Sequence, residues 1–558
     1  MKKNILCMSQ KYGWTKKSYD GNIFWFKGYI LDATVDSVIK SASLCLSRLG
    51  KNRDSLSSFI SSIRGHFSFI IYNGNALIAV VDKVATIPLF YAEDSSNIVI
   101  GSNATAVKDI APEGNFSLDM SSILEISMSG YTVGNKTLYK QMKQIVAGEY
   151  IYVCNGCIHK QYYHTYSPWK VNAISNVSLK SELTNVLTDV MDKLASSIKG
   201  KDIIVPLSAG YDSRAVVSGL KHVGVENILC VSYGRKDSFE VLAAKNIASR
   251  LGYDFKHIDY NGSYIRRQNS SYKYNKFKND FDRHSSVEFV QDMPFISLMH
   301  KTNELSNNSV IINGMSGDYI SGSHILRAFS KFAHNANYPR DYDDKMFNIA
   351  IMEYLDKHYN LWGFLSDNNN KNKIIYNLLE LLKDRNLNYK NIDNMHSVFE
   401  FFEFYGRQSK FVLKGQEVYD YYGCDWRLPL WDPVFVDFWQ KVPIDYKYSQ
   451  KLYKDVLVEN NWGGVWDNIP LNEKTIRPKW IKPIRLASKI LLSPLGRKKW
   501  HQFEKNFLEY WMDDSYNSKR YPYSRYVFDY KEHKNVISFR VEDYIQNHTD
   551  IGIDTLTI

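Results

Sequence analysis

Short apolar runs separated by turn residues fill the first part of the chain. Residues 67–72 and 76–81 are rich in Phe, Ile and Val and flank an Asn-Gly-Asn turn, which predicts a β-hairpin. Residues 148–163 predict a second hairpin around another Asn-Gly turn, and helical spacing appears near 34–63. The pattern predicts a mostly antiparallel, strand-rich α+β sandwich over residues 1–170.

After about residue 178 the pattern changes to apolar strands that alternate with amphipathic helices. Residues 181–198 place Leu, Val, Met and Ile at helical spacing, and a second helix is predicted from about 238 to 250. The predicted strands are 202–206, 228–232, 255–258 and 310–312. This alternation is typical of a doubly wound parallel sheet of the α/β class, which binds ligands at the carboxyl ends of its strands.

The last part of the chain predicts a helical C-terminal extension. Residues 482–492 are basic and amphipathic, and Arg497-Lys498-Lys499 adds further positive charge. We expect this helix to dock on the preceding α/β domain, with contact to a membrane surface as the alternative.

Length and composition limit the remaining choices. A chain of 558 residues is too long for one ordinary domain, so we expect three units, at 1–170, 178–475 and 476–558. The net charge of +11 fits phosphate-rich ligands, nucleic acid or an anionic membrane equally well. Six cysteines in a chain this long favour a reducing cytoplasm, and the absence of an 18-residue apolar run predicts no transmembrane helix. Cys154 and Cys157 are better explained by a hairpin turn than by zinc.

The most informative stretch is Asp202–Arg214, in which an apolar strand, a turn of small residues and the start of a helix follow one another. A helix N-terminus presents unpaired N–H groups and the positive end of the peptide dipoles, so this geometry favours an anion. Small residues let the backbone approach a phosphate, and the hydroxyls of Ser208 and Ser213 supply further hydrogen bonds. The order of a Walker loop is absent, because no lysine follows the glycine.

This loop resembles the S-G-G-x-D-S pyrophosphate loop of enzymes that split ATP into AMP and pyrophosphate, with Ala209 in place of the first glycine. Further segments are similar to asparagine synthetases and follow in the order of that family. They are Arg64–Phe69 with Asp82-Lys83 and Ile87–Tyr91, Ser232–Glu240, Val310–Asp318, Asp425–Asp432 and Lys451–Lys454. The resemblance covers about residues 60–165 and 178–475.

The resemblance implies an N-terminal-nucleophile-like first domain and a second domain that binds ATP and Mg²⁺. It assigns Asp318 and Lys451 to catalysis, with Lys451 facing the developing charge, and Asp212 and Asp318 to the metal. Glu240 would hold a loop in place, while Arg427 and Asp432 would shape the domain. The residues implied in ATP or pyrophosphate contacts are Leu207, Ser208, Ala209, Gly210, Asp212, Ser213, Tyr233, Asn313 and Gly314.

One departure from the family affects the incoming amine. Met315 stands where the family has a glutamate, and a thioether can neither take a proton nor bind an ammonium ion. Glu400 and Glu403 are candidate substitutes, although on a helix of mixed character we expect them to be solvated.

A second departure affects glutamine hydrolysis. In the family, removal of Met1 exposes a cysteine whose α-amino group is the base, but here position 2 is Lys2. The next cysteine, Cys7, has an amide nitrogen that cannot act as a base, so we expect it to be a small core residue. The family's Asn-Gly-Glu segment is also absent, with Phe26–Tyr29 the nearest counterpart. We therefore predict no glutaminase nucleophile and no glutaminase activity.

The resulting hypothesis is a cytoplasmic ligase that adenylates a carboxylate and joins it to ammonia or an amine. Aspartate is the family's usual acid, and a sugar or peptide substrate stays open, as does the oligomeric state. Two alternatives belong to other classes: a non-catalytic scaffold and a pyrophosphate-loop enzyme that modifies RNA. The second usually needs paired thiols near the loop and an RNA-binding module, and neither is found here, so we expect no nucleic-acid partner.

Overall fold

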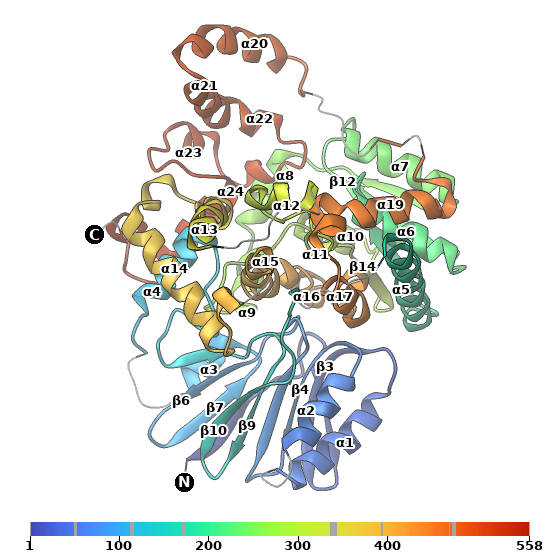
Figure 1. Cartoon of the computed structure of the whole chain (residues 1–558), viewed down its shortest axis with the longest axis vertical. Helices are drawn as coiled ribbons and strands as arrows, with labels where there is room; N and C mark the ends of the chain where they lie inside the picture. Colours follow the sequence, from blue (N-terminus) through green and yellow to red (C-terminus); the bar gives the residue numbers. More distant parts are fainter. Residues whose placement is uncertain are drawn as a thin grey trace.

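A computed structural model describes most of the chain (Figure 1). The described residues are 2–49, 53–111, 116–169, 175–334, 343–391, 394–467, 469–470 and 476–556. The predicted unit boundaries near 170 and 475 lie outside them.

Two sheets form the first domain. The four-stranded sheet has the order β1 (Lys3–Cys7), β7 (Asn97–Gly101), β6 (Phe90–Glu93) and β8 (Met142–Gln144). The six-stranded sheet has the order β10 (Cys157–Tyr162), β9 (Glu149–Cys154), β5 (Leu77–Val81), β4 (Gly65–Tyr72), β3 (Asn22–Ile30) and β2 (Thr15–Tyr19). Both predicted hairpins are confirmed, as β4–β5 and β9–β10. The sheets are not wholly antiparallel, because β1 pairs with β7 in parallel.

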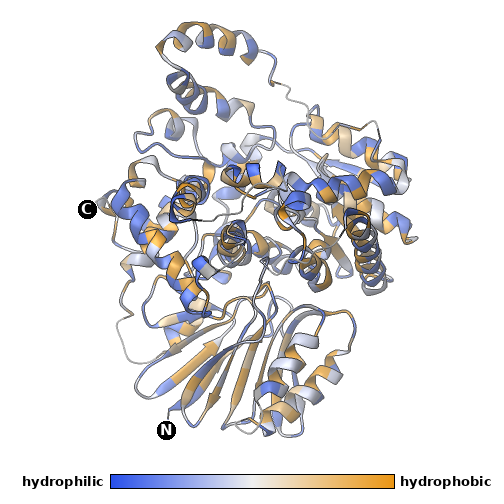
Figure 2. Cartoon of the chain, in the orientation of Figure 1, coloured by the Kyte–Doolittle hydropathy of each residue, from blue (hydrophilic) through white to orange (hydrophobic). Residues whose placement is uncertain are grey.

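The central strands of the six-stranded sheet are buried on both faces, which explains their continuous apolar runs. Ile70 and Ala79 belong to the core shared with the four-stranded sheet, whereas Phe69 and Val80 face the helices α1 (Val35–Ser47) and α2 (Arg53–Ser62). Successive side chains therefore point to opposite faces, as the strand period of two requires. These strands are largely orange in Figure 2.

A five-stranded parallel sheet organises the second domain, as predicted. Its order is β13 (Asp254–Ile258), β12 (Ile228–Tyr233), β11 (Asp202–Pro206), β14 (Ser309–Ile312) and β15 (Asp425–Arg427). The chain leaves β11 toward β12 and returns on its other side as β14, so the strand order reverses between β11 and β14. A crevice forms at such a point beyond the carboxyl ends of the strands, and this is where an α/β sheet binds ligands.

Helices flank this sheet on the right of Figure 1. They are α5 (Asn176–Ser197), α6 (Tyr211–His222), α7 (Phe239–Leu251) and α19 (Lys451–Asn460). The predicted helix at 181–198 is the larger part of α5, which begins at the capping residue Ser175. The wider body includes α4 (Met120–Ser129), α9 (Tyr272–Asp280), α10 (Met293–Lys301), α13 (Asp344–His358), α14 (Asn368–Lys383), α15 (His396–Glu403) and α17 (Pro433–Trp439).

The C-terminal extension contains two parts with different surroundings. The basic helix α20 (Ile481–Leu492) and α21 (Arg497–Phe503) lie at the top of Figure 1, apart from the parallel sheet. Our expectation that this helix docks on the α/β domain is therefore wrong: it packs in a small core of Ile481, Trp500 and Leu508. The later helix α24 (Val536–His548) packs against α4 of the body, and α23 (Tyr523–Val527) packs against residues 504–509 and contacts α24 through Arg525. Within the described residues, no helix is both long and apolar enough to cross a membrane.

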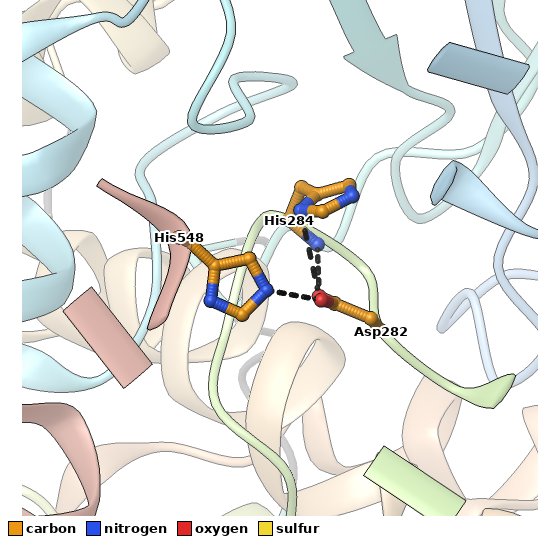
Figure 3. Close-up of side chains that lie close together, drawn as sticks. All are labelled: Asp282, His284 and His548. Atoms are coloured by element: carbon orange, nitrogen blue, oxygen red, sulfur yellow. Dashed lines mark hydrogen bonds and ion pairs between the residues drawn. The ribbon is translucent and has the colours of Figure 1, made fainter. Parts of the chain in front are cut away.

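A cluster of Asp282, His284 and His548 anchors the end of α24 (Figure 3). The imidazole Nε2 of His548 contacts Asp282 Oδ2, and its Nδ1 lies 2.7 Å from the carbonyl of Tyr544. Burial opposes the charge on His548, but the Asp282 carboxylate outweighs it and raises the pKa of His548. Burial likewise works against the Asp282 carboxylate, yet the two histidines hold the pKa of Asp282 below its usual range.

We expect His548→Gln to lower the free energy of unfolding by about 1–3 kcal/mol near pH 5, because a charged hydrogen bond is lost. The raised pKa of His548 means that this contribution is complete below about pH 6.5 and disappears as pH rises through the folded value. The lowered pKa of Asp282 makes it disappear again as pH falls below about 4. Urea denaturation across pH measures the difference, and a difference independent of pH would contradict the ion pair.

Candidate active site

The loop after β11 keeps its helix N-terminus open. Gly210 is the N-cap of α6 and no side chain caps the helix there. Ser213 Oγ accepts a hydrogen bond from the Ser208 amide at 3.0 Å, and Ser208 Oγ accepts one from the Gly210 amide at 3.1 Å. Both hydroxyls thus lie at the mouth of the helix, where the backbone dipoles favour an anion.

Ala209 fits the turn that the sequence assigns to it. The predicted role of Glu240 is confirmed, since its carboxylate accepts a hydrogen bond from the Ala209 amide at 2.8 Å. The carbonyl of Ala209 accepts a hydrogen bond from the buried Arg214 at 2.6 Å. Ala209 does not have a positive φ, so its methyl group causes no backbone strain at the position where the family has glycine.

The loop after β14 meets the start of α6 closely. A Cβ on Gly314 would lie 2.9 Å from the carbonyl carbon of Asp212 and from the Ser213 nitrogen, so this position requires glycine. The Asp318 amide donates to Asp212 Oδ2 at 2.8 Å, which joins the two loops across the reversal in strand order. Asn313 Oδ1 accepts a hydrogen bond from the Met315 amide at 2.8 Å and shapes the turn.

These two loops enclose a cavity of about 510 Å³ at the carboxyl ends of β11 and β14. Among the predicted residues, Ala209 and Lys451 do not line it: Ala209 is buried behind the loop, and Lys451 is exposed at the start of α19. Gln450, the preceding residue, does line it. The predicted residues that line the cavity are Leu207, Ser208, Gly210, Asp212, Ser213, Tyr233, Asn313, Gly314 and Asp318.

Two carboxylates in the cavity have the chemistry of a Mg²⁺ site. Burial, and then the charge of Asp318, raise the pKa of Asp212 well above its usual range. Burial also opposes the Asp318 carboxylate, but His324 outweighs it and lowers the pKa of Asp318. Asp212 Oδ1 is buried without a well-formed hydrogen bond. An oxygen left without a donor beside a second carboxylate fits a hard divalent cation, so Asp212 and Asp318 would hold Mg²⁺.

A row of ionisable side chains, His324, Glu403 and His358, leads away from Asp318. His324 Nε2 lies 3.3 Å from Asp318 Oδ2, and its Nδ1 lies 2.5 Å from Glu403 Oε1. Glu403 Oε2 lies 3.1 Å from His358 Nε2. Burial disfavours the charged imidazole, but the two carboxylates raise the pKa of His324 to about 9. Its contacts with both carboxylates let His324 orient the Asp318 side chain.

Our expectation that Glu400 and Glu403 are solvated is wrong. Both side chains are buried, and Glu400 contacts the ammonium of Lys447 at 2.5 Å. All eight residues of α15 are buried, although His396, Glu400 and Glu403 follow the i, i+4, i+7 spacing of one polar face. Both glutamates meet partners from other segments, His324 and His358 for Glu403 and Lys447 for Glu400, so the helical pattern alone does not reveal their burial.

Several lining residues escaped the sequence analysis. Asp292 accepts hydrogen bonds from the Tyr233 hydroxyl at 2.7 Å and from the Asn313 amide nitrogen at 3.0 Å. Asp514 and Ser515 come from the C-terminal extension, and Asp514 contacts the Arg235 side chain at 2.7 Å. The extension thus contributes to the cavity of the second domain, although its sequence carries no motif that announces this.

The expected structural role of Arg427 and Asp432 agrees with their contacts. Arg427 donates to the Ser197 carbonyl at 3.1 Å and lies 4.3 Å from the centre of the Tyr29 ring. Asp432 accepts two hydrogen bonds at 3.0 Å from Arg64 of the first domain. Both residues therefore join the two domains, away from the cavity.

The comparisons with known proteins add to this geometry. A model of the glutamine amidotransferase domain matches residues 51–164. The Microcin J25-processing protein McjC of Escherichia coli is 23% identical over 213 residues, which are 37% of this chain and 39% of that protein. The chain thus aligns with well under half the length of this curated relative.

Two solved structures were also found, both with low overall similarity. The allosteric regulatory enzyme of purine biosynthesis is 10% identical with a TM-score of 0.18, over 43% of this chain and 61% of that one. Glutamine phosphoribosylpyrophosphate amidotransferase from B. subtilis, complexed with ADP and GMP, is 11% identical with a TM-score of 0.19, over 44% and 72%. The match to an amidotransferase domain and the similarity to a microcin-processing protein are compatible with the resemblance to asparagine synthetases seen in the sequence.

Proposed function

We propose that this chain is an ATP-dependent ligase that adenylates a substrate carboxylate and forms an amide with ammonia or an amine. The observation that carries the proposal is the open cavity between the β11 and β14 loops, which holds an uncapped helix N-terminus and, among its acidic residues, the adjacent Asp212 and Asp318. Its volume of about 510 Å³ lies in the usual range of small-molecule sites.

The reaction has two steps. An oxygen of the substrate carboxylate attacks the α-phosphorus of ATP, the acyl-adenylate forms and pyrophosphate leaves. The nitrogen nucleophile then attacks the acyl carbon, the amide bond forms, and AMP leaves with the bonding electrons. Ser208, Gly210 and Ser213 bind the pyrophosphate by donated hydrogen bonds at the start of α6. Asp212 and Asp318 would hold Mg²⁺, which would supply positive charge to the phosphates.

Lys451 is the proposed cation for the developing charge. Its side chain is exposed one residue after Gln450, which lines the cavity, so a change of rotamer toward the cavity is required. Because Met315 stands where the family has a glutamate, we assign no lining residue as the acid–base group for the nucleophile. The relative from Escherichia coli processes a microcin, which supports a peptide carboxylate as a candidate substrate beside aspartate.

Exchange of labelled pyrophosphate into ATP tests the first step. We expect exchange that requires both Mg²⁺ and a carboxylic acid, with aspartate and peptide acids compared directly. No exchange with any acid would favour the scaffold alternative. Exchange driven by an RNA instead of an acid would favour an RNA-modifying enzyme.

The surroundings of Cys7 in the first domain disfavour glutamine hydrolysis. Cys7 ends the strand β1, and its backbone pairs with that of Gly101. Burial, and then the charge of Asp109, raise the pKa of the Cys7 thiol, which is the opposite of what a nucleophile needs. We therefore propose that ammonia or an amine reaches the second domain without release from glutamine in the first.

We expect Cys7→Ala to leave pyrophosphate exchange and amide formation within about twofold of the wild-type rate, because a half-buried thiol with a raised pKa is a poor nucleophile. Release of glutamate from glutamine should be absent in both proteins, as measured by a coupled glutamate assay. Release by the wild-type protein that the substitution removes would contradict the proposal.

A further inference from the structure

The projecting segment, residues 476–512, extends from the rest of the molecule at the top of Figure 1. It contains α20 and α21 and ends with α22 (Tyr510–Met512) (Figure 1). Ile481, Trp500 and Leu508 form its own small core, which covers one side of α20. The other side of this helix faces outward.

A continuous apolar stripe runs along that outward side. Trp480, Ile484, Leu491 and Leu495 are 52%, 47%, 73% and 60% exposed. With Ala487 between them, the first three follow the i, i+4, i+7, i+11 spacing that places side chains on one face of a helix. Ile490, at 66%, widens the stripe. Single exposed apolar residues are ordinary, but a stripe of this length on one helix marks an interaction surface.

The charge beside the stripe is mainly positive, with Glu504 in contact with Arg485 of α20. Residues 476–503 contain eight Lys or Arg and no Asp or Glu, in a chain whose net charge is +11. Lys482 and Lys489 are exposed and lie seven residues apart, so they share a second face of α20. The surface therefore combines an apolar face with a cationic border.

We propose that the projecting segment binds an anionic lipid surface, with α20 lying in the plane of the membrane interface. An amphipathic helix with lysines on one face and Trp and Leu on the other is suited to this position, where the apolar side chains enter and the charges meet lipid phosphates. Trp480 and Trp511, whose ring centres lie 5.9 Å apart, provide the amphipathic rings that favour the headgroup level.

This inference goes beyond the proposed ligase activity and does not depend on it. The segment ends at Met512, and Asp514 and Ser515 line the cavity two and three residues later. The end of the projecting segment is thus adjacent in the chain to residues that line the cavity. A ligase held in this way would take its acid or amine from substrates at the lipid surface.

Vesicle flotation of the full-length protein tests the proposal. We expect flotation with vesicles of phosphatidylglycerol and phosphatidylcholine, a blue shift of tryptophan fluorescence, and weaker binding in high salt or to phosphatidylcholine alone. The variant Ile490→Glu/Leu491→Glu should bind these vesicles at least about tenfold more weakly than the wild-type protein, because it places two charges in the apolar stripe. Lys482→Glu/Lys489→Glu should lose the preference for anionic lipid.

The matched control is Ile349→Glu, which changes an aliphatic residue of α13 that is 53% exposed. It should float like the wild-type protein, and circular dichroism should show that all variants keep their helices. Failure of the wild-type protein to float, or flotation of Ile490→Glu/Leu491→Glu at the wild-type level, would overturn the inference. A lipid-free dimer that this double variant abolishes would instead assign the stripe to a second copy of the chain.

Discussion

Asp212→Asn is expected to lower the rate of pyrophosphate exchange by about 10²- to 10³-fold, the loss typical of removing one electrostatic stabiliser from an active site. The same substitution should leave the melting temperature unchanged or raise it. Burial and the neighbouring Asp318 raise the pKa of Asp212, so its charged form destabilises the folded protein at neutral pH. A neutral amide of the same shape removes this cost and keeps an acceptor for the Asp318 amide.

The opposite directions of the two effects make the experiment specific. A residue that only supports the fold would lose activity and stability together, whereas a residue kept for chemistry shows a trade-off between them. Asp425→Asn is the matched control, since Asp425 lies in β15 of the same sheet and its side chain is 52% exposed. It should change exchange by less than about twofold. Exchange by Asp212→Asn at the wild-type rate with saturating Mg²⁺ would remove Asp212 from the metal site.

Local sequence patterns predicted those parts of the fold in which consecutive residues all favour the same element. The strand β11, the small-residue loop and α6 follow from a few consecutive residues, and the loop lies at the carboxyl end of this central strand. The two hairpins of the first domain follow from Asn-Gly turns between apolar runs. In these cases propensity, period and turn chemistry all point to the same structure.

What escaped prediction depends on contacts between distant residues. Asp514 lies in the cavity because the chain returns after the projecting segment, and Arg235 holds it there across 279 positions. Glu403 is buried because His324 and His358, from two other segments, supply its partners. The strand β15 has three residues, too few for a periodic signal, and forms because β14 offers it an edge. No local pattern encodes such pairings.

The interface between the two domains leads to the second large effect. Lys27 of β3 contacts Asp420 of the second domain at 2.7 Å, and both side chains are 7% exposed. We expect Lys27→Met to lower the free energy of unfolding by about 3–5 kcal/mol, because the Asp420 carboxylate is then buried without its cation. The remaining donor to Asp420, the indole nitrogen of Trp426 at 3.0 Å, is neutral and cannot replace it. Urea denaturation followed by tryptophan fluorescence measures the change.

Two further variants test separately how burial and charge contribute to the stability lost in Lys27→Met. Lys17 and Asp36 also lie 2.7 Å apart in the first domain, but their side chains are 47% and 72% exposed. Lys17→Met should therefore cost less than about 1 kcal/mol, since water screens an exposed pair. Adding Asp420→Asn to Lys27→Met should restore part of the lost stability, because the unpaired charge is gone. Equal losses for the two lysine variants would mean that burial does not set the strength of the contact between the domains.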